Sequence, residues 1–298
     1  MEEFNIRLIT TEEEFESVVI NAMVKESWRP GLKDAECFLT CDPTGTFVGE
    51  LNGTPIGFVF LTKYGENYGH IGGYLVRKEY RGKGYGLKIF NAALANVKSS
   101  RSIGLYAVQD KEQMYQRSGF HSHFNGGRFV FHLPTAVVCF SASLEQSSVK
   151  VKCIDQVDQK ALFMYDSSVF GFERHPFLSK WLCVTGSRAH AAINKEGAIV
   201  GYVVARPTFV KEDGYRIGPL FADSESIAEM LLKALFEELL QHEKPPPAVI
   251  IDTPTERATK LAEKLQGKSS FGLVYMVTKE LPEACFNKWF GVTAVEIG

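Results

Sequence analysis

Residues 70–97, HIGGYLVRKEYRGKGYGLKIFNAALANV, predict a strand, a glycine-rich loop and a helix in direct succession. The run from His70 to Val76 is short and apolar, with the aromatic and β-branched bias of a buried strand. From Leu87 to Val97, apolar residues recur at helical spacing. The three glycines of the loop at residues 81–86 lack a Cβ, so the backbone can turn tightly and come close to a ligand.

The loop predicts a binding site for phosphate. The first N–H groups of a helix have no partner within the helix and carry the positive end of its dipole, which favours phosphate oxygens there. Arg81 and Lys83 add two mobile positive charges. The loop is neither a dinucleotide fingerprint nor a Walker loop, because it contains neither G-x-G-x-x-G nor G-K-[ST]. The alternative is a plain glycine-rich turn before a helix.

Length and composition predict a soluble protein of two domains. A chain of 298 residues suits domains at residues 1–136 and 149–298, divided in the stretch from Pro134 to Val149, which is rich in Ser and small residues. The net charge of −2 gives no general attraction to nucleic acid. No apolar run reaches transmembrane length and the N-terminus is acidic, so we expect a cytoplasmic protein that does not contact membranes. The six cysteines lack metal-site spacing, and we expect reduced thiols and no metal.

The first half predicts a mixed α/β sheet. An edge strand at 4–10 is followed by two helices, a hairpin across Asn52-Gly53 and the strand that ends at Val76. After the loop and its helix, we expect a strand at 103–108, a helix at 111–118 and a strand at 124–133 that breaks at Gly126-Gly127.

The second half repeats this order with an offset of roughly 143 residues. Its strand at 215–221 takes the place of the strand before the glycine loop. The chain then runs through Ala222-Asp223-Ser224 straight into a helix at 227–241, without a glycine loop. Asp223 places a carboxylate at the helix start, where it would cap the helix and repel phosphate.

The loop resembles the acyl-CoA loop of the GNAT superfamily of N-acyltransferases, [QR]-x-x-G-x-[GA] after a strand that ends in a hydrophobic residue. Arg81, Gly84 and Gly86 fill this pattern. The whole chain resembles a tandem GNAT protein with an intact first copy and a degenerate second copy, on the motifs WRPGLKDA (28–35), MYQRSGF (114–120), YRIGPLFAD (215–223) and WFGVTAVEIG (289–298). The resemblance implies an α/β fold of two GNAT domains and acetyl-CoA as the acyl donor. It assigns the donor site to Tyr74, Leu75, Val76, Arg81, Gly82, Lys83, Gly84, Tyr85 and Gly86.

The resemblance also implies catalytic and acceptor residues. Tyr115 occupies the position, four residues before a Gly-Phe pair, of a tyrosine that commonly protonates the leaving thiolate. His70 lies where some members carry a catalytic Glu, and it could accept a proton from the amine, although a strand-end histidine bonded to a loop is the alternative. Period-two alternation places His70 and Tyr74 on one face unless a bulge breaks the parity. Trp28, Arg29 and Asp34 lie in the segment that borders the acceptor cleft, although Asp34 is equally suited to cap a helix.

Two functions from different classes follow from this interpretation. The first is an N-acetyltransferase in which a small-molecule primary amine attacks acetyl-CoA directly in a ternary complex. We expect this protein to be a monomer or a homodimer. The second is a CoA-binding sensor or interaction protein whose second copy covers the acceptor cleft.

Overall fold

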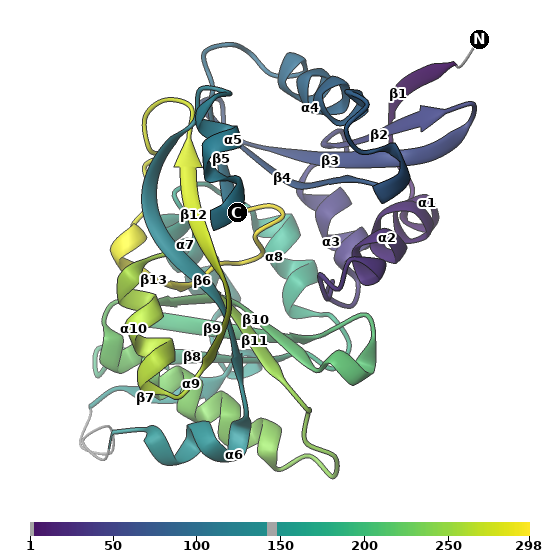
Figure 1. The fold of residues 1–298 in the computed structure, drawn as a ribbon. Coiled ribbons are helices and arrows are strands. Elements are labelled where there is room, and N and C mark those ends of the chain that lie inside the picture. The colour runs from purple at the N-terminus through teal and green to yellow at the C-terminus, as the bar shows by residue number, and fades with distance from the viewer. Residues whose placement is uncertain (1–2, 142–147) are drawn as a thin grey trace.

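The computed structural model describes residues 3–141 and 148–298, and within them the strands form one continuous mixed sheet (Figure 1). The strand order is β1-β2-β3-β4-β5-β12-β6-β11-β10-β9-β8-β7, and β13 pairs with β10 beside this path. The mixed α/β fold class predicted from the sequence is confirmed. The strands are β1 Phe4–Leu8, β2 Thr46–Leu51, β3 Thr54–Tyr64, β4 Tyr68–Val76, β5 Ser102–Val108, β6 His121–Phe131, β7 Lys150–Cys153, β8 Arg188–Ile193, β9 Ile199–Pro207, β10 Tyr215–Ala222, β11 Val249–Thr253, β12 Lys268–Val277 and β13 Trp289–Gly291.

Helices cover both faces of the sheet (Figure 1). On one face lie the N-terminal helices together with α7 and α8; on the other, α4 covers the first half and α9 and α10 cover the second. The α-helices are α1 Glu12–Phe15, α2 Asn21–Lys25, α3 Asp34–Cys41, α4 Tyr85–Ala95, α5 Glu112–Gln116, α6 Leu133–Ala136, α7 Gln159–Phe170, α8 His175–Leu182, α9 Glu225–Leu240 and α10 Glu256–Lys264. A π-helical turn, Glu16–Ile20, joins α1 to α2.

Local sequence signals explain several element boundaries. The Thr11 side chain accepts a hydrogen bond of 3.3 Å from the Glu14 backbone N–H and caps α1. Asn52 and Gly53 have φ of 51° and 74°, as the two central residues of a type I′ turn require, and they join β2 to β3. The hairpin across Asn52-Gly53 was predicted from the sequence and is confirmed.

The two halves exchange strands at the centre of the sheet. In the first half β5 pairs with β12 of the second half, and in the second half β11 pairs with β6 of the first. The strands β6 and β12 also pair with each other, from Val130 opposite Lys268 to His121 opposite Val277. Each half therefore completes the sheet of the other.

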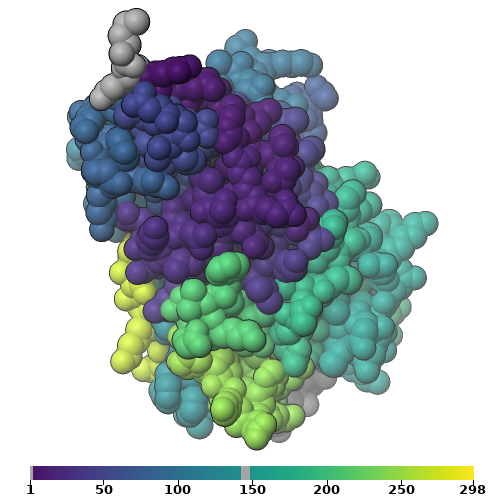
Figure 2. Space-filling model, turned by 90° about the vertical axis from the view of Figure 1, so that its right-hand side faces the viewer, coloured from purple at the N-terminus to yellow at the C-terminus, as the bar shows by residue number. Residues whose placement is uncertain are grey.

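The hydrophobic core on the face of the N-terminal helices is shared in the same way. Phe38 of α3 stacks on Trp181 of α8, with ring centroids 6.4 Å apart. The Tyr68 and Tyr275 hydroxyls, one from each half, lie 2.8 Å apart. Figure 2 shows the purple N-terminal residues directly against green residues of the second half.

The strand β6 is continuous at its two glycines. The break predicted at Gly126-Gly127 is wrong, because β6 runs through both glycines. A methyl group on Gly126 would lie 1.9 Å from the carbonyl oxygen of Thr253, so the glycine permits close approach of the end of β11. The predicted boundary stretch begins with α6 and a 3-10 turn, Val137–Cys139; its residues 142–147 lie outside the described residues.

Candidate active site

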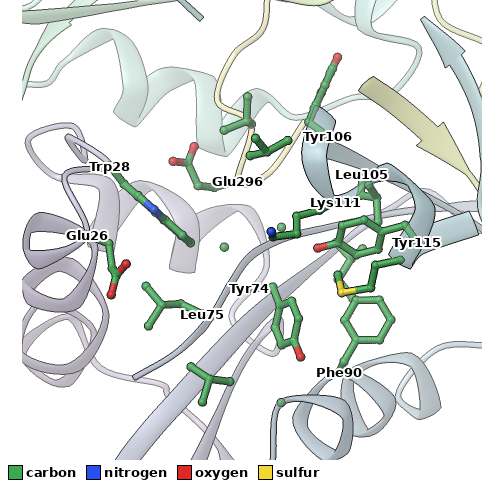
Figure 3. A pocket seen from close by; sticks show the side chains of 18 of the residues that line it. Glu26, Trp28, Tyr74, Leu75, Phe90, Leu105, Tyr106, Lys111, Tyr115 and Glu296 are labelled. Carbon is green, nitrogen blue, oxygen red and sulfur yellow. The ribbon is translucent and has the colours of Figure 1, made fainter. Parts of the chain in front are cut away.

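A cavity of about 680 Å³ opens where β4 and β5 diverge (Figure 3). The two parallel strands are paired only from Tyr68 opposite Ser102 to His70 opposite Gly104, and they separate beyond that point. The glycine loop and α4 close one end of the cavity. The rest of its wall is formed by β5, α5, β12 and the segment at residues 295–296.

The loop has the geometry of an anion site at a helix N-terminus. Gly84 is the N-cap of α4 with φ of 83°, and no side chain of the described residues makes a capping hydrogen bond there. The start of α4 therefore has the geometry in which backbone N–H groups of a helix bind an anion. Arg81, Gly82, Gly84 and Gly86 all line the cavity.

The charged and aromatic neighbours of the loop hold its shape. The Arg81 side chain donates from Nε to the Val76 carbonyl oxygen at 2.7 Å and pairs with Glu26 at 2.9 Å. Lys83 lies 5.6 Å from the centroid of the Tyr80 ring, and Tyr85 packs against Phe4, with ring centroids 4.9 Å apart. Neither Lys83 nor Tyr85 is among the residues that line the cavity.

A bulge in β4 breaks the regular alternation of its side chains between the two faces of the sheet. Phe58 pairs with Leu75 and Phe60 pairs with Gly72, so Gly73 and Tyr74 together face one residue of β3. Gly73 accommodates the bulge with φ of 55°. The expectation that His70 and Tyr74 share a face is therefore wrong: Tyr74 packs on Phe90 of α4, and His70 contacts the segment around Val295.

Tyr115 lies on α5 and lines the cavity beside Phe90 of α4 (Figure 3). Its ring packs against Phe90 and Phe120, with centroid distances of 6.2 Å and 5.9 Å. Burial raises the pKa of its phenol above the ordinary value, so the phenol keeps its proton at neutral pH. A phenol in this state can donate a proton or a hydrogen bond into the cavity.

His70 is fully buried and is not among the residues that line the large cavity. Its Nε2 lies 3.1 Å from the Val295 carbonyl oxygen, and its Nδ1 lies 3.3 Å from the Tyr68 hydroxyl. Burial lowers its pKa to about 4. The imidazole is therefore a neutral group that holds segment 295–298, and its position does not support the catalytic role expected for it.

The three residues expected at the acceptor end separate in the structure. Trp28 lines the cavity, whereas Arg29 and Asp34 do not. Arg29 approaches Asp213 at 3.7 Å, and the buried Asp34 pairs with Arg206 at 2.8 Å.

Residues from the second half that sequence reasoning did not assign to the site complete the acceptor end. Glu296 lines the cavity, and a buried chain of ion pairs connects it to Arg128, which also lines it. Arg128 binds Asp252 through two hydrogen bonds of 2.7 Å and 2.8 Å; Arg216 then bridges Asp252, at 3.3 Å, and Glu296, at 3.2 Å. Arg216 and Glu296 lie in the motifs at residues 215–223 and 289–298, but these motifs did not assign them to the site.

The second copy has a matching divergence of strands, but it is filled. The parallel strands β10 and β11 pair only from Tyr215 to Ile217, and β13 then pairs with β10. A methyl group on Gly218 would lie 2.3 Å from the carbonyl oxygens of Val292 and Thr293, so segment 291–293 packs directly on this backbone. Ser224 caps α9, and not Asp223 as expected; Asp223 pairs with Lys288 at 2.9 Å.

Among the described residues, no group of three or more His, Cys, Asp or Glu side chains is placed to hold a metal ion. In the same part of the chain, no helix is both long and apolar enough to cross a membrane.

Comparison with protein families agrees with this architecture. The model of the acetyltransferase (GNAT) family matches residues 10–120, and the model of an acetyltransferase (GNAT) domain matches residues 162–288. The chain therefore belongs to the GNAT superfamily and is an N-acyltransferase with two GNAT domains in tandem.

Individual relatives support the tandem arrangement. A holothin acyltransferase of Pseudoalteromonas sp. (strain SANK 73390) is 29% identical over 238 residues, which cover 78% of this chain and 73% of the relative. An acetyltransferase structure from Pyrococcus horikoshii has a TM-score of 0.73 at 21% identity and covers 99% of this chain and 96% of its own. A tandem GNAT protein from the clavulanic acid biosynthesis pathway has a TM-score of 0.66 at 17% identity and covers 92% of this chain and 98% of its own. Both structures establish the fold.

Proposed function

We propose that this protein transfers the acetyl group of acetyl-CoA to the primary amine of a small molecule, by direct attack in a ternary complex. The observation that carries the proposal is the single cavity that joins the uncapped N-terminus of α4, the diverging end of β4 and Tyr115. Acetyl-CoA supplies a thioester carbonyl and a thiolate leaving group.

The glycine loop fits the phosphate groups of CoA. Positive φ at Gly82 and Gly84 turns the backbone, and a methyl group at either position would meet no protein atom within 4 Å. The open side of the loop thus leaves room for a ligand beside the first N–H groups of α4. Beyond the loop, the cavity passes Tyr74, Leu75 and Val76, the backbone assigned to the acyl end of the donor.

Tyr115 is proposed as the proton donor to the thiolate. The partly buried phenol is protonated at neutral pH, so it has a proton to share with the thiolate by hydrogen bonding, and to deliver to it, as the C–S bond breaks. The aromatic contacts with Phe90 and Phe120 fix the ring on the cavity wall.

Direct attack is favoured because the cysteines near the N-terminal helices are poor nucleophiles. Burial raises the pKa of Cys37 to about 12 and that of Cys41 to about 11, so the thiolate is scarce at neutral pH. Neither residue lines the cavity. All six cysteines are free, which supports action in the reducing cytosol.

The acceptor is proposed to be a small-molecule amine because the relative from Pseudoalteromonas is named as a holothin acyltransferase, and because aromatic side chains, those of Trp28, Tyr106 and Phe271, line the acceptor end of the cavity. The test is release of free thiol from acetyl-CoA across a panel of primary amines, with mass spectrometry of the products. We expect an amine-dependent thiol signal and an acetylated product. Tight CoA binding without turnover on any amine would instead indicate a CoA-binding sensor.

A further inference from the structure

We propose that Glu296, which the second half contributes to the cavity, binds the ammonium group of the acceptor and accepts its proton. This inference rests on the proposed acyl transfer and names the class of acceptor: a protonated primary amine on an aromatic or apolar body.

Glu296 lies directly over the diverging end of β4. A methyl group on Gly72 would stand 2.4 Å from the carbonyl oxygen of Glu296 and 2.8 Å from its Cα. Gly72 is two residues from Tyr74, where the acyl end of the donor is assigned. Figure 3 shows Glu296 and Trp28 on one side of the cavity and Tyr115 on the other, with Tyr74 between them.

The hydrogen-bonding state of this end of the cavity favours a cation. Each Glu296 carboxylate oxygen accepts one hydrogen bond of 3.2 Å from Arg216, which leaves further acceptor sites on a carboxylate. Arg128 directs Nε and Nη2 to Asp252 and Nη1 to the Trp28 carbonyl oxygen at 3.3 Å. Two positive charges, on Arg128 and Arg216, balance the two negative charges on Asp252 and Glu296. The free hydrogen-bond acceptor sites are those of the Glu296 carboxylate, so this end of the cavity favours a ligand that donates hydrogen bonds to Glu296.

Hydrogen bonds to residues before and after Glu296 in the sequence hold its carboxylate in place. Arg174 donates to the Thr293 hydroxyl at 2.9 Å, and the Tyr64 hydroxyl donates to the Ile297 carbonyl oxygen at 2.7 Å. His70 donates to the Val295 carbonyl oxygen at 3.1 Å. A carboxylate on a segment fixed at three points is preorganised for a ligand.

The lining around Glu296 selects the body of the amine. Trp28, Tyr106 and Phe271 present aromatic surface, and Leu273 and Val295 add aliphatic surface. An arylalkyl ammonium satisfies both features, because its cation reaches the carboxylate while its ring lies against the aromatic wall.

The protons and bonds of the transfer balance with these residues. Glu296 accepts one proton from the ammonium, which frees the nitrogen lone pair. The nitrogen then forms a C–N bond with the thioester carbonyl carbon as the C–S bond breaks. Tyr115 gives its proton to the thiolate, and the second proton released by the nitrogen restores the phenol. The net products are the amide, free CoA and one proton.

The experiment measures acetylation of phenethylamine by the full chain and by Glu296→Gln, with Glu229→Gln as the matched control. Glu229 is another buried carboxylate, paired with Lys264 outside the cavity. We expect Glu296→Gln to lower kcat/KM for the amine by about 10²-fold or more, in the range of a general base, while the calorimetric Kd for CoA stays within about threefold. Glu296→Asp should retain part of the activity, and Glu229→Gln all of it.

Equal turnover of phenethylamine by the parent and Glu296→Gln would overturn the inference and leave the proposed function intact. If the parent acetylates other amines but not phenethylamine, the assigned acceptor class is wrong. If the parent acetylates no amine, the proposed function itself fails. A second measurement needs no variant: phenethylamine should bind the CoA-loaded parent, and 2-phenylethanol, which has the same body without the cation, should not. Equal binding of both would also contradict the role of Glu296.

Discussion

Tyr115 occupies a wall of the cavity where its ring is fixed and its hydroxyl stays protonated. Removing only the hydroxyl with Tyr115→Phe preserves the contacts with Phe90 and Phe120. We expect Kd for CoA to be unchanged and the chemical step to slow by about 10²- to 10⁴-fold, the usual contribution of a general acid. Single-turnover kinetics are the measurement, because product release cannot mask chemistry there. A parental single-turnover rate would make Tyr115 a packing residue.

His70 gives a prediction for the pH dependence of stability. Its pKa in the folded protein is lowered to about 4, below the ordinary value of 6.5, so the folded state binds the proton less readily than the unfolded chain. The contribution of neutral His70 is complete above pH 6.5 and is lost as the pH falls toward 4. Integrated over that window, the loss is about 3 kcal/mol.

Urea unfolding of the parent and of His70→Gln at several pH values tests this. As the pH falls from 7 to about 4.5, the parent should lose more free energy of unfolding than His70→Gln, because only the parent has the buried imidazole. The exposed His121→Gln serves as the matched control. A difference that stays constant with pH would show that His70 is not buried as a neutral group.

Glu296 shows which residues of a site stay hidden in a sequence. Tyr115 and the glycines of the loop could be predicted because short motifs fix their spacing to one strand and one helix. Glu296 reaches Gly72 only through the path of segment 291–298 across the sheet, and no local periodicity encodes that path. The parity of His70 and Tyr74 was missed for a related reason, because the bulge at Gly73 depends on how β3 pairs with β4.

At the scale of elements, the unit of β4, the glycine loop and α4 was predictable almost completely. The apolar run, the glycines and the helical spacing each favour the same local structure. β4 starts two residues before its predicted start, and α4 both starts and ends two residues before its predicted bounds. The strand order could not be predicted, because the exchange of β6 and β12 depends on pairing between residues far apart in the chain.

A substitution of Gly84 tests whether the glycine loop binds the phosphate groups of CoA. A valine there must adopt φ of 83°, which strains an L residue, and its side chain would occupy the open space assigned to phosphate. We expect Gly84→Val to weaken CoA binding at least tenfold, about 1.4 kcal/mol, without unfolding the protein. Gly53→Val, at another positive φ remote from the cavity, controls for backbone strain. Unchanged affinity of Gly84→Val in calorimetry would reject the loop as the phosphate site.

At the scale of the whole molecule, the two halves depend on each other for folding. A first half cut within residues 142–147 would lose β12 from between β5 and β6 and expose two long strand edges. It would also lose the partners of Phe38 and Tyr68 in the shared core. We therefore propose that the predicted boundary at residues 136–149 divides two sequence repeats and not two folding units, and we expect neither side of it to fold alone.

Expression of residues 1–141 and 148–298, separately and together, tests this dependence. We expect each fragment alone to aggregate or to lack a cooperative thermal transition. Together they should copurify as one complex that binds CoA. A first fragment that is monomeric, melts cooperatively and binds CoA by itself would contradict the interdependence.

We propose that each chain holds one donor site, built on the first copy, because segment 289–293 fills the equivalent gap in the second copy. A calorimetric titration of the full chain with CoA tests this proposal. We predict a stoichiometry of one CoA per chain, with heat that is lost in Gly84→Val at the same concentrations. A stoichiometry of two CoA per chain would contradict this proposal. Binding of one CoA with unchanged heat and affinity in Gly84→Val would contradict it as well.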